Sequence, residues 1–327
     1  MLSEGLSSRY TAMVLLGLLR EAPEVIADVL HGDGLVAVCD SLLAEVPALR
    51  NLGDAALVLW AATALQHPGV CGARERVRQL LAEQQTPATV EVAWALTALS
   101  HVSAVAGGEL RQQTAQLLLA ARDGRSGLFR HATGRGGWLR GHVGCFADQV
   151  YPILALAHYA IVSQNTEALR VAGCCAARIC SLQGTDGQWW WHYDTRNGRV
   201  IEGYPVYAVH QDAMAPMALF ALEEAGGPPR RAAVQRGLDW LVAPPELGGD
   251  SLIDDDAGVI WRKVARHEPR KFVRRCQALV SRLHPVLRVP GVNTLFPPTT
   301  IDYECRPYHL GWLLYAWPAS RAQGWAT

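Results

Sequence analysis

The residues best suited to acid and base chemistry lie in two segments far apart in the chain. In the first, Val209-His-Gln-Asp, His210 stands two residues before Asp212. A histidine beside a carboxylate can titrate near neutrality and act as a general acid or base. We therefore expect His210, supported by Asp212, to transfer a proton at a substrate. The alternative is that His210 caps a helix or forms a hydrogen bond in the core.

The second segment, Ile301-Asp-Tyr-Glu-Cys-Arg-Pro-Tyr-His, is dense in hydrogen-bonding side chains. Its Pro307 suits the first turn of a helix and so fixes where that helix begins. We expect Arg306 to hold an anionic substituent of a substrate. His309 or His192 would then work on the substrate from the side opposite His210. The side chains predicted to contribute from this segment are Asp302, Glu304, Arg306, Tyr308 and His309.

A run of aromatic residues precedes the first segment. Asn197-Gly198, between two extended runs, predicts a β-hairpin with strands over 188–194 and 199–204. Alternation would place one set of side chains, Trp189, Trp191 and Tyr193, opposite another, Trp190, His192 and Asp194. Such tryptophans can stack on sugar rings, enclose a hydrocarbon, or simply pack the hairpin onto the molecule. The substrate-binding side chains predicted here are Trp189, Trp190, Trp191, Tyr193, Asp194, Glu202, Tyr204, Tyr207 and Gln211.

Two other segments carry charge in a suggestive pattern. The stretch from Gly124 to Cys145 is rich in glycine and basic residues, and Arg140 within it could clamp a carboxylate or phosphate, although a solvated loop would have the same composition. Asp254-Asp255-Asp256 could bind a divalent cation or donate a proton, but acidic runs after a Gly-Gly turn more often cap a helix. None of the eight cysteines is paired at metal-ligand spacing. We therefore predict no metal site and no cofactor.

The spacing of apolar residues predicts two kinds of helix that would position these side chains. Outer helices are amphipathic with a charged face, whereas inner helices are apolar almost all round and polar only near their starts. Outer helices are expected over 34–46, 74–83, 109–122, 166–182, 230–242 and 270–283. Inner helices are expected over 8–19, 54–65, 89–99, 147–162, 210–222 and 308–316. Their strict alternation predicts an all-α (α/α)6 toroid, with an open solenoid as the alternative.

All inner helices of such a ring run in one direction, so their polar starts gather at one mouth. Helix N-termini there favour anionic groups on a ligand. The side chains expected at this mouth are Arg9, Tyr10, Asp54, Glu91, Asp148, Gln149, His210, Gln211, Asp212, Arg306, Tyr308 and His309. Asp148 and Gln149 thereby join the predicted site. Pro216 should bend its inner helix, and this requires a neighbouring group to take up the lost hydrogen bond.

Composition narrows the class of protein. The chain has 327 residues, half of them hydrophobic and 18% charged, which suits one large-cored domain over residues 1–327. Thirty basic residues balance thirty acidic ones, so no net field would attract nucleic acid or an anionic membrane. No apolar stretch is long enough to span a bilayer. We expect a cytoplasmic protein with reduced cysteines.

One segment resembles a family of helical toroids. Ala177-Arg-Ile-Cys-Ser-Leu-Gln-Gly-Thr-Asp-Gly-Gln-Trp is similar to the Gln/Trp repeat of the terpenoid cyclase and protein prenyltransferase toroids. This resemblance implies a ring of inner and outer helices and an isoprenoid substrate. Class II terpene cyclases also carry an Asp-x-Asp-Asp acid. Here Leu252 and Ile253 precede Asp254, so the first aspartate is missing.

A second segment resembles a different family with the same layout. Gly187-x-Trp, then Gly198-Arg-Val, Tyr204 and Tyr207-Ala before an Ala- and Leu-rich helix are similar to the N-acylglucosamine 2-epimerase and sugar isomerase barrels. The match covers roughly 40 residues. In that family histidines at the mouth act as acid and base on the sugar, and the resemblance carries this role to His210.

The polarity of the mouth separates these two resemblances. A cyclase guiding a carbocation needs a mostly apolar cavity, whereas a sugar site needs the His, Asp, Glu, Arg and Tyr side chains that this chain supplies. The sequence therefore favours a carbohydrate-active enzyme that uses general acid and base catalysis, as an epimerase or isomerase, a lyase or a glycoside hydrolase. Its partner would be a small-molecule or oligosaccharide substrate. The alternatives are a cyclase-like toroid acting on an isoprenoid and a non-catalytic toroid that binds a glycan or a protein.

Overall fold

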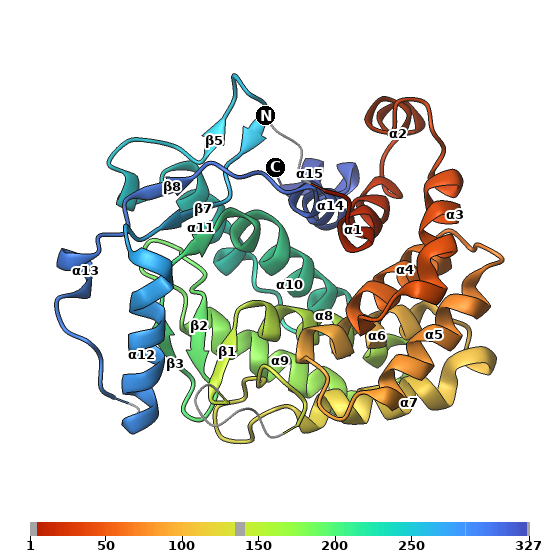
Figure 1. The fold of residues 1–327 in the computed structure, drawn as a ribbon, viewed down its shortest axis with the longest axis horizontal. Helices are drawn as coiled ribbons and strands as arrows, with labels where there is room; N and C mark the ends of the chain where they lie inside the picture. The colour runs from red at the N-terminus through yellow and green to blue at the C-terminus, as the bar shows by residue number, and fades with distance from the viewer. Residues whose placement is uncertain (1–4, 135–140, 285, 326–327) are drawn as a thin grey trace.

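The computed structural model describes residues 5–134, 141–284 and 286–325, and in these residues helices form a closed ring (Figure 1). Each inner helix packs on its neighbours in the order α1, α4, α6, α8, α10, α14 and back to α1. Their bounds are α1 Ser8–Leu18, α4 Leu52–Ala64, α6 Thr89–His101, α8 Ala147–Ser163, α10 Ala215–Glu224 and α14 Pro307–Ala316. The contact between α1 and α14 closes the ring, so the predicted toroid is confirmed and the open solenoid is wrong.

Outer helices cover the ring from outside. They are α3 Leu35–Glu45, α5 Val70–Glu83, α7 Ala104–Ala120, α9 Thr166–Ser181 and α11 Arg231–Val242, with the short α2 Pro23–Val29 before α3. Only one stripe of α5 is buried, Ala73, Val77 and Leu80, as expected for a helix that is wet on its other side. The short α15, Ala319–Trp325, follows α14 and lies on α11, where Trp325 Nε1 donates to Gln235 Oε1 at 3.0 Å. Among the described residues no helix is both long and apolar enough to cross a membrane.

The closure between α1 and α14 depends on two glycines. A Cβ on Gly17 would lie 2.4 Å from the Gly311 carbonyl oxygen, and a Cβ on Gly311 would lie 2.4 Å from the Met13 carbonyl oxygen. Any larger side chain at either position would force the two backbones apart. The first and last inner helices therefore approach as closely as they do because both carry glycine at the crossing (Figure 1).

Aromatic side chains fill the bore of the ring. The Trp60 ring on α4 lies 5.8 Å from Trp312 and 5.3 Å from Tyr315, both on α14. Trp312 Nε1 donates to the Tyr151 hydroxyl of α8 at 2.8 Å, and Tyr151 lies 5.0 Å from Trp94 of α6. All five side chains are buried. Because α4 and α8 are not neighbours of α14 in the ring, the contacts of Trp60 and Tyr151 with α14 run across its centre.

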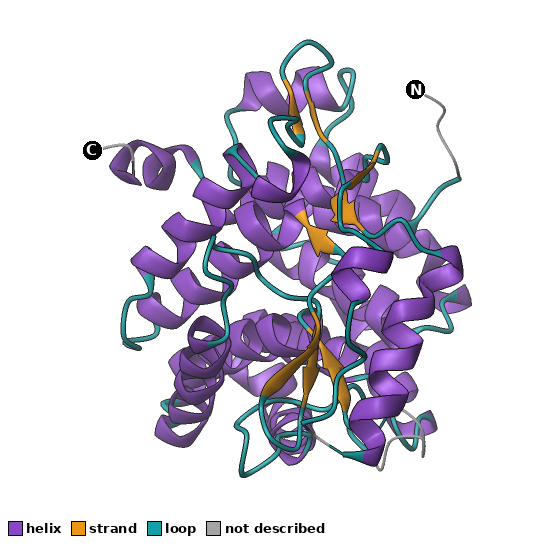
Figure 2. Cartoon of the chain, turned by 90° about the vertical axis from the view of Figure 1, so that its left-hand side faces the viewer, coloured by secondary structure: helices purple, strands orange, loops and turns teal. Residues whose placement is uncertain are grey.

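Short strands gather on one side of the molecule (Figure 2). One antiparallel sheet has the order β1-β2-β3, with β1 Val143–Cys145, β2 His192–Asp194 and β3 Arg199–Glu202. A second has the order β4-β7-β8, with β4 Val206–Tyr207, β7 Lys263–Ala265 and β8 Thr300–Asp302, and β5 Ile253–Asp254 pairs with β6 Val259–Ile260. Strands β1, β4 and β8 lead directly into the starts of the neighbouring inner helices α8, α10 and α14. The sheets therefore lie at the mouth.

The hairpin predicted from Asn197-Gly198 is confirmed, but its first strand is shorter than predicted. Strand β2 begins at His192, and the backbone bends at Trp191, so the predicted alternation of faces fails there. The rings of Trp191 and His192 are stacked, with centroids 4.3 Å apart. The register of the hairpin also shifts between His192 and Tyr193.

One helix predicted to belong to the outer layer has a different place. Helix α12, Phe272–Leu283, packs on β3 rather than on an inner helix. Its Ala278 packs with Val143 of β1 and Ile201 of β3, so its apolar stripe covers the β1-β2-β3 sheet (Figure 1). The remaining short helical turns are η1 Val46–Ala48, η3 Pro245–Leu247, η4 Pro269–Lys271 and α13 Val292–Leu295.

Candidate functional site

The mouth, defined here as the face formed by the first residues of the six inner helices in the described chain, is held together by charged groups. Arg9 of α1 donates to Asp54 of α4 at 2.7 Å and to Asn51 at 2.9 Å. Asn51 in turn donates to Glu91 of α6 at 2.7 Å. Three helix starts are thus linked by one hydrogen-bonded chain, and Arg9 lies over the Trp94 ring at 5.2 Å.

On the other side of α1 the mouth combines tyrosines with cations. Arg306, before α14, donates to the Tyr10 hydroxyl at 3.0 Å and to Glu304 at 2.6 Å. Glu304 also forms an ion pair with Arg262. The Tyr308 ring lies 5.1 Å from Tyr10, and burial raises the pKa of Tyr308 to about 12, so its hydroxyl keeps its proton at neutral pH.

The central pair of the mouth joins His309 of α14 to Asp212. His309 Nε2 lies 2.8 Å from each oxygen of the Asp212 carboxylate, and both side chains are buried. Asp212 belongs to the π-helical turn η2, His210–Met214, that precedes α10. With the Nε2 proton donated to the carboxylate, Nδ1 is the nitrogen left for a substrate or water.

The backbone at Asp212 is held by a tryptophan from beyond α14. In an α-helix the Asp212 carbonyl would accept from the N–H of residue 216, and Pro216 has none. Trp317 Nε1 supplies the replacement and donates to the Asp212 carbonyl oxygen at 2.5 Å. The predicted need for a compensating hydrogen bond is therefore confirmed, and the group that supplies it follows α14, the helix that carries His309.

The predicted support of His210 by Asp212 is wrong, because Asp212 is bonded to His309. His210 is packed between the rings of Phe146 at 4.5 Å and Tyr207 at 4.9 Å. Its Nδ1 is buried without a hydrogen-bond partner among the described residues. Burial is the main cause that lowers the pKa of His210 to about 3; a hydrogen bond to the Trp189 backbone opposes the shift, and the nearby His309 adds a smaller lowering. His210 is therefore neutral at physiological pH.

Trp191 and His192 enter the mouth as one packed unit. The partly exposed Trp191 ring is stacked on buried His192, lies 5.5 Å from Tyr207, and has the Arg274 guanidinium 4.5 Å from its centre. Arg262 and Lys263 each lie 5.5 Å from the Tyr207 ring. The structure thus surrounds the aromatic groups at this edge of the mouth with cations.

Several predicted substrate-binding residues are engaged in holding the fold instead. Gln149 bonds the Phe129 backbone in both directions, and Gln211 bonds the Tyr207 carbonyl and the Trp189 N–H. Glu202 forms a buried ion pair with Arg266 at 3.0 Å. Asp194 forms an ion pair with Arg196, and the Tyr204 hydroxyl donates to Glu246. The Trp190 ring packs against Tyr204, and Trp189 and Tyr193 are buried in the core. Arg140 lies outside the described residues.

The three aspartates at 254–256 form a turn and do not cap a helix. They connect β5 to β6, where the Asp254 side chain accepts the Ala257 N–H at 2.9 Å and the Asp255 carbonyl accepts the Gly258 N–H at 3.3 Å. Gly258 has φ +63, which suits the reversal of the chain. Asp302 likewise has a local role, since it forms an ion pair with Lys263 across β8 and β7.

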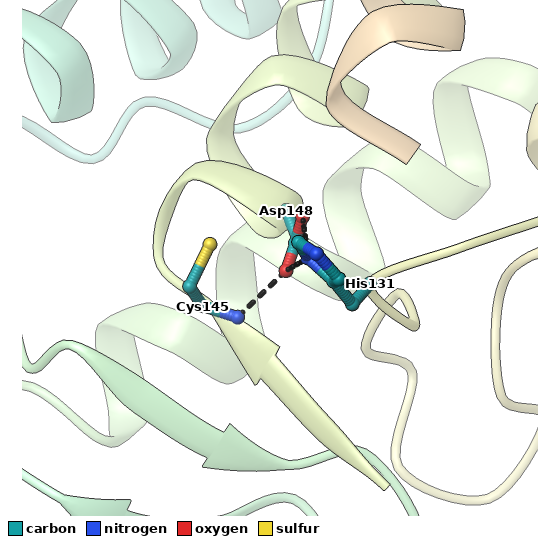
Figure 3. Close-up of side chains that lie close together, drawn as sticks. All are labelled: His131, Cys145 and Asp148. Atoms are coloured by element: carbon teal, nitrogen blue, oxygen red, sulfur yellow. Dashed lines mark hydrogen bonds and ion pairs between the residues drawn. The ribbon is translucent and has the colours of Figure 1, made fainter. Parts of the chain in front are cut away.

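The start of α8 brings together three side chains, of which only Asp148 was predicted as an individual site residue. Fully buried Asp148 lies 3.1 Å from Nδ1 of His131, whose side chain is 68% exposed, and it accepts the Cys145 N–H at 2.7 Å. The Cys145 thiol lies beside them (Figure 3). Their spacing, Cys-x-x-Asp with a histidine fourteen residues before the cysteine, matches none of the usual ligand motifs.

Comparisons with known proteins place the fold. No protein-family model matches the chain, and no curated protein matches it. A cellobiose 2-epimerase from Bacillus thermoamylovorans is similar with a TM-score of 0.58 at 11% identity, over 96% of this chain and 87% of its own. An unsaturated glucuronyl hydrolase specific for heparin has a TM-score of 0.57 at 13% identity, over 98% of this chain and 88% of its own. A family 105 glycoside hydrolase from C. acetobutylicum has a TM-score of 0.56 at 12% identity, over 94% of this chain and 92% of its own. The chain therefore has the (α/α)6 toroid fold shared by these enzymes.

Proposed function

We propose that the protein is a carbohydrate-active enzyme that uses general acid and base catalysis at the mouth of the toroid. The observation that carries this proposal is the buried pair of His309 and Asp212 among the helix starts. A carboxylate that accepts from one ring nitrogen fixes the tautomer of the imidazole and stabilises the imidazolium that forms after proton transfer. His309 would accept a proton from the sugar through Nδ1 and return it later in the cycle.

The surroundings of this pair suit a sugar. The partly buried Tyr10, Tyr207 and Tyr308 supply hydroxyl groups, and Arg306 with Glu304 supplies charged hydrogen-bonding groups beside them. Sugars are bound by many directed hydrogen bonds together with aromatic faces. The solved structures with this fold include an epimerase and two glycoside-cleaving enzymes, which supports the same class of substrate.

Two features argue against an isoprenoid substrate. A carbocation cavity would need the bore, but Trp60, Trp312 and Tyr315 occupy it. The Gln/Trp motif also has a structural use here, because Gln183 donates to the Gly187 and Ala233 carbonyls at 2.8 and 2.9 Å and accepts from Arg236 at 2.6 Å. Through these bonds Gln183 ties the end of α9 to α11, which explains the motif without cyclase chemistry.

The test is a direct search for conversion of sugars. The purified protein is incubated with cellobiose, D-mannose and an unsaturated glucuronyl disaccharide from heparin, in D2O, and products are followed by NMR. Epimerisation or isomerisation would place deuterium on a sugar carbon, whereas hydrolysis would give a new anomeric signal. We expect one of these sugars to be converted by the wild type. His31→Gln, in an exposed turn before α3, serves as the matched histidine control.

Two outcomes would contradict the proposal. One is that none of the three classes of sugar is converted at enzyme concentrations near those of the substrate. The other is that conversion persists at the wild-type rate when His309→Gln is tested beside the His31→Gln control. Both variants would first be compared with the wild type by circular dichroism.

A further inference from the structure

The side chains of His131, Cys145 and Asp148 converge at the start of α8. One nitrogen of the His131 ring, the Cys145 sulfur and a carboxylate oxygen of Asp148 all lie within 4.8 Å of one another. Figure 3 shows the three side chains near one another, on the loop that precedes β1, at the end of β1 and in the first turn of α8. A nitrogen, a sulfur and an oxygen donor are the three ligand types that zinc accepts.

The backbone that presents these groups is firmly held. The His131 carbonyl accepts the Thr89 N–H of α6 at 2.9 Å, and the Thr133 N–H two residues on donates to the Pro87 carbonyl at 3.0 Å. The Asp148 carboxylate is oriented by the Cys145 N–H, and the Cys145 carbonyl accepts from Gln149 at 3.2 Å. Ligand groups fixed in this way need little rearrangement to close on an ion.

We propose that His131, Cys145 and Asp148 bind a divalent transition-metal ion, with Zn²⁺ the best fit. The His131 nitrogen and the Asp148 oxygen are 3.1 Å apart, close to the separation of about 3.3 Å between two ligands of one tetrahedral Zn²⁺. The ion would replace the hydrogen bond between them and draw in the thiolate. A thiolate ligand favours Zn²⁺ over Mg²⁺ and Ca²⁺, which prefer oxygen.

Three protein ligands leave the fourth tetrahedral position open. His131 faces solvent, with 68% of its side chain exposed, so water or a ligand oxygen can fill that position. The N–H groups at the start of α8 carry a partial positive charge, which disfavours a cation. Asp148 and the Cys145 thiolate would outweigh it with two full negative charges. Metal binding at these residues does not depend on the proposed sugar chemistry, since His309 and Asp212 take no part in it.

The proposal is tested by binding of the metal alone, without any sugar. The full chain is treated with a chelator, freed of it, and titrated with Zn²⁺ in competition with a chromophoric chelator, then with Co²⁺ as a spectroscopic probe. We expect one ion per chain and, for Co²⁺, the intense thiolate charge-transfer band together with the visible bands of tetrahedral coordination. Cys145→Ser should weaken Zn²⁺ binding by at least about 100-fold. Loss of a residue that only supports a ligand already lowers metal affinity by about 10–100-fold, and Cys145 would be a ligand itself.

Matched variants separate this site from adventitious binding. Cys174→Ser removes an exposed thiol of α9 and should change neither the affinity nor the cobalt spectrum. Asp148→Asn keeps an oxygen that can accept the Cys145 N–H but removes the charge, so it should weaken binding in a chain that still folds by circular dichroism. The proposal is overturned if Cys145→Ser binds Zn²⁺ as the wild type does, or if the cobalt complex shows no thiolate band.

Discussion

Two histidines at the mouth have opposite chemical characters because their surroundings differ. His309 Nε2 lies 2.8 Å from both oxygens of the Asp212 carboxylate, which fixes the orientation of the ring. His210 is enclosed by Phe146 and Tyr207, and burial among these rings lowers its pKa to about 3. The same residue type thus serves as a candidate proton carrier in one place and as a neutral packing group in the other.

The buried, neutral His210 predicts a pH dependence of stability. Between about pH 6.5 and pH 3 the unfolded chain binds a proton at this position that the folded chain does not, so stability falls as the pH falls through this range. His210→Phe keeps a ring between Phe146 and Tyr207 but removes the titrating imidazole, and with it this pH dependence of stability. In urea unfolding, the wild type should lose about 2 kcal/mol more than the variant between pH 7 and pH 5, because the slope approaches about 1.4 kcal/mol per pH unit only below pH 6.5. Equal slopes for the two proteins would show that His210 is not buried as described.

The sequence was sufficient to name both members of the central pair but not to pair them. His309 and Asp212 were each predicted from their chemistry, but they are 97 residues apart, and sequence spacing favoured the nearer partner, His210. The π-helical turn and the contact of α14 with η2 decide the pairing, and neither leaves a local signal. His131 and Cys145 were missed as candidates for the same reason, since only the folded loop brings them to Asp148.

At the scale of elements, α14 and the residues just after it position Asp212 from two directions. His309 near its start binds the Asp212 carboxylate, and Trp317 just after its end binds the Asp212 carbonyl, whose α-helical donor position is occupied by Pro216. The tryptophan is therefore a positioning residue for the pair.

Trp317→Phe tests this arrangement, because it keeps an aromatic ring against Phe220 and Trp325 but removes the Nε1 donor. A carbonyl left without a partner in a partly buried place costs about 1–3 kcal/mol, so we expect that loss in the free energy of unfolding. Sugar conversion should fall as well, mainly in kcat. Trp325→Phe is the matched control, since its Nε1 bonds only the exposed Gln235 side chain. Similar effects of the two substitutions would contradict the positioning role.

For helix α12, the spacing of apolar residues predicted the helix but not its packing partner. Its amphipathic spacing indicated a helix that is wet on one side, and that is correct, but the pattern does not say which surface the apolar side meets. The β1-β2-β3 sheet offered that surface, and its first strand was not predicted. The hairpin was predicted because Asn197-Gly198 is a local signal, whereas β1 joins it from residues about fifty positions earlier.

At the scale of the whole molecule, closure of the ring joins the two ends of the chain. Helix α1 packs on α14 through Gly17 and Gly311, and the aromatic groups in the bore join helices that are not neighbours. The alternation of helix types was enough to predict the ring and its polar mouth. It could not predict the filled bore, because the sequence of one inner helix does not indicate which helix on the opposite side of the ring its side chains contact.

Gly311→Ala tests how tightly the ring is closed. The added Cβ would overlap the Met13 carbonyl, so α1 and α14 must separate, and we expect a loss of about 1–3 kcal/mol in the free energy of unfolding. Gly173→Ala on α9 is the matched control, because a Cβ there meets no atom within 4 Å and the substitution should stabilise the helix by about 0.5–1 kcal/mol. If Gly311→Ala were as stable as Gly173→Ala, the close contact would not exist in solution.

The central claim is that His309, oriented by Asp212, transfers the proton during conversion of a sugar. The most direct measurement is kcat/KM for the wild type and for His309→Gln on the sugar that the wild type converts, with His31→Gln as the control. General acid and base catalysis contributes about 10²–10⁴-fold, so we predict a loss of that size in His309→Gln and none in the control. A value of kcat/KM for His309→Gln equal to that of the wild type would contradict the claim.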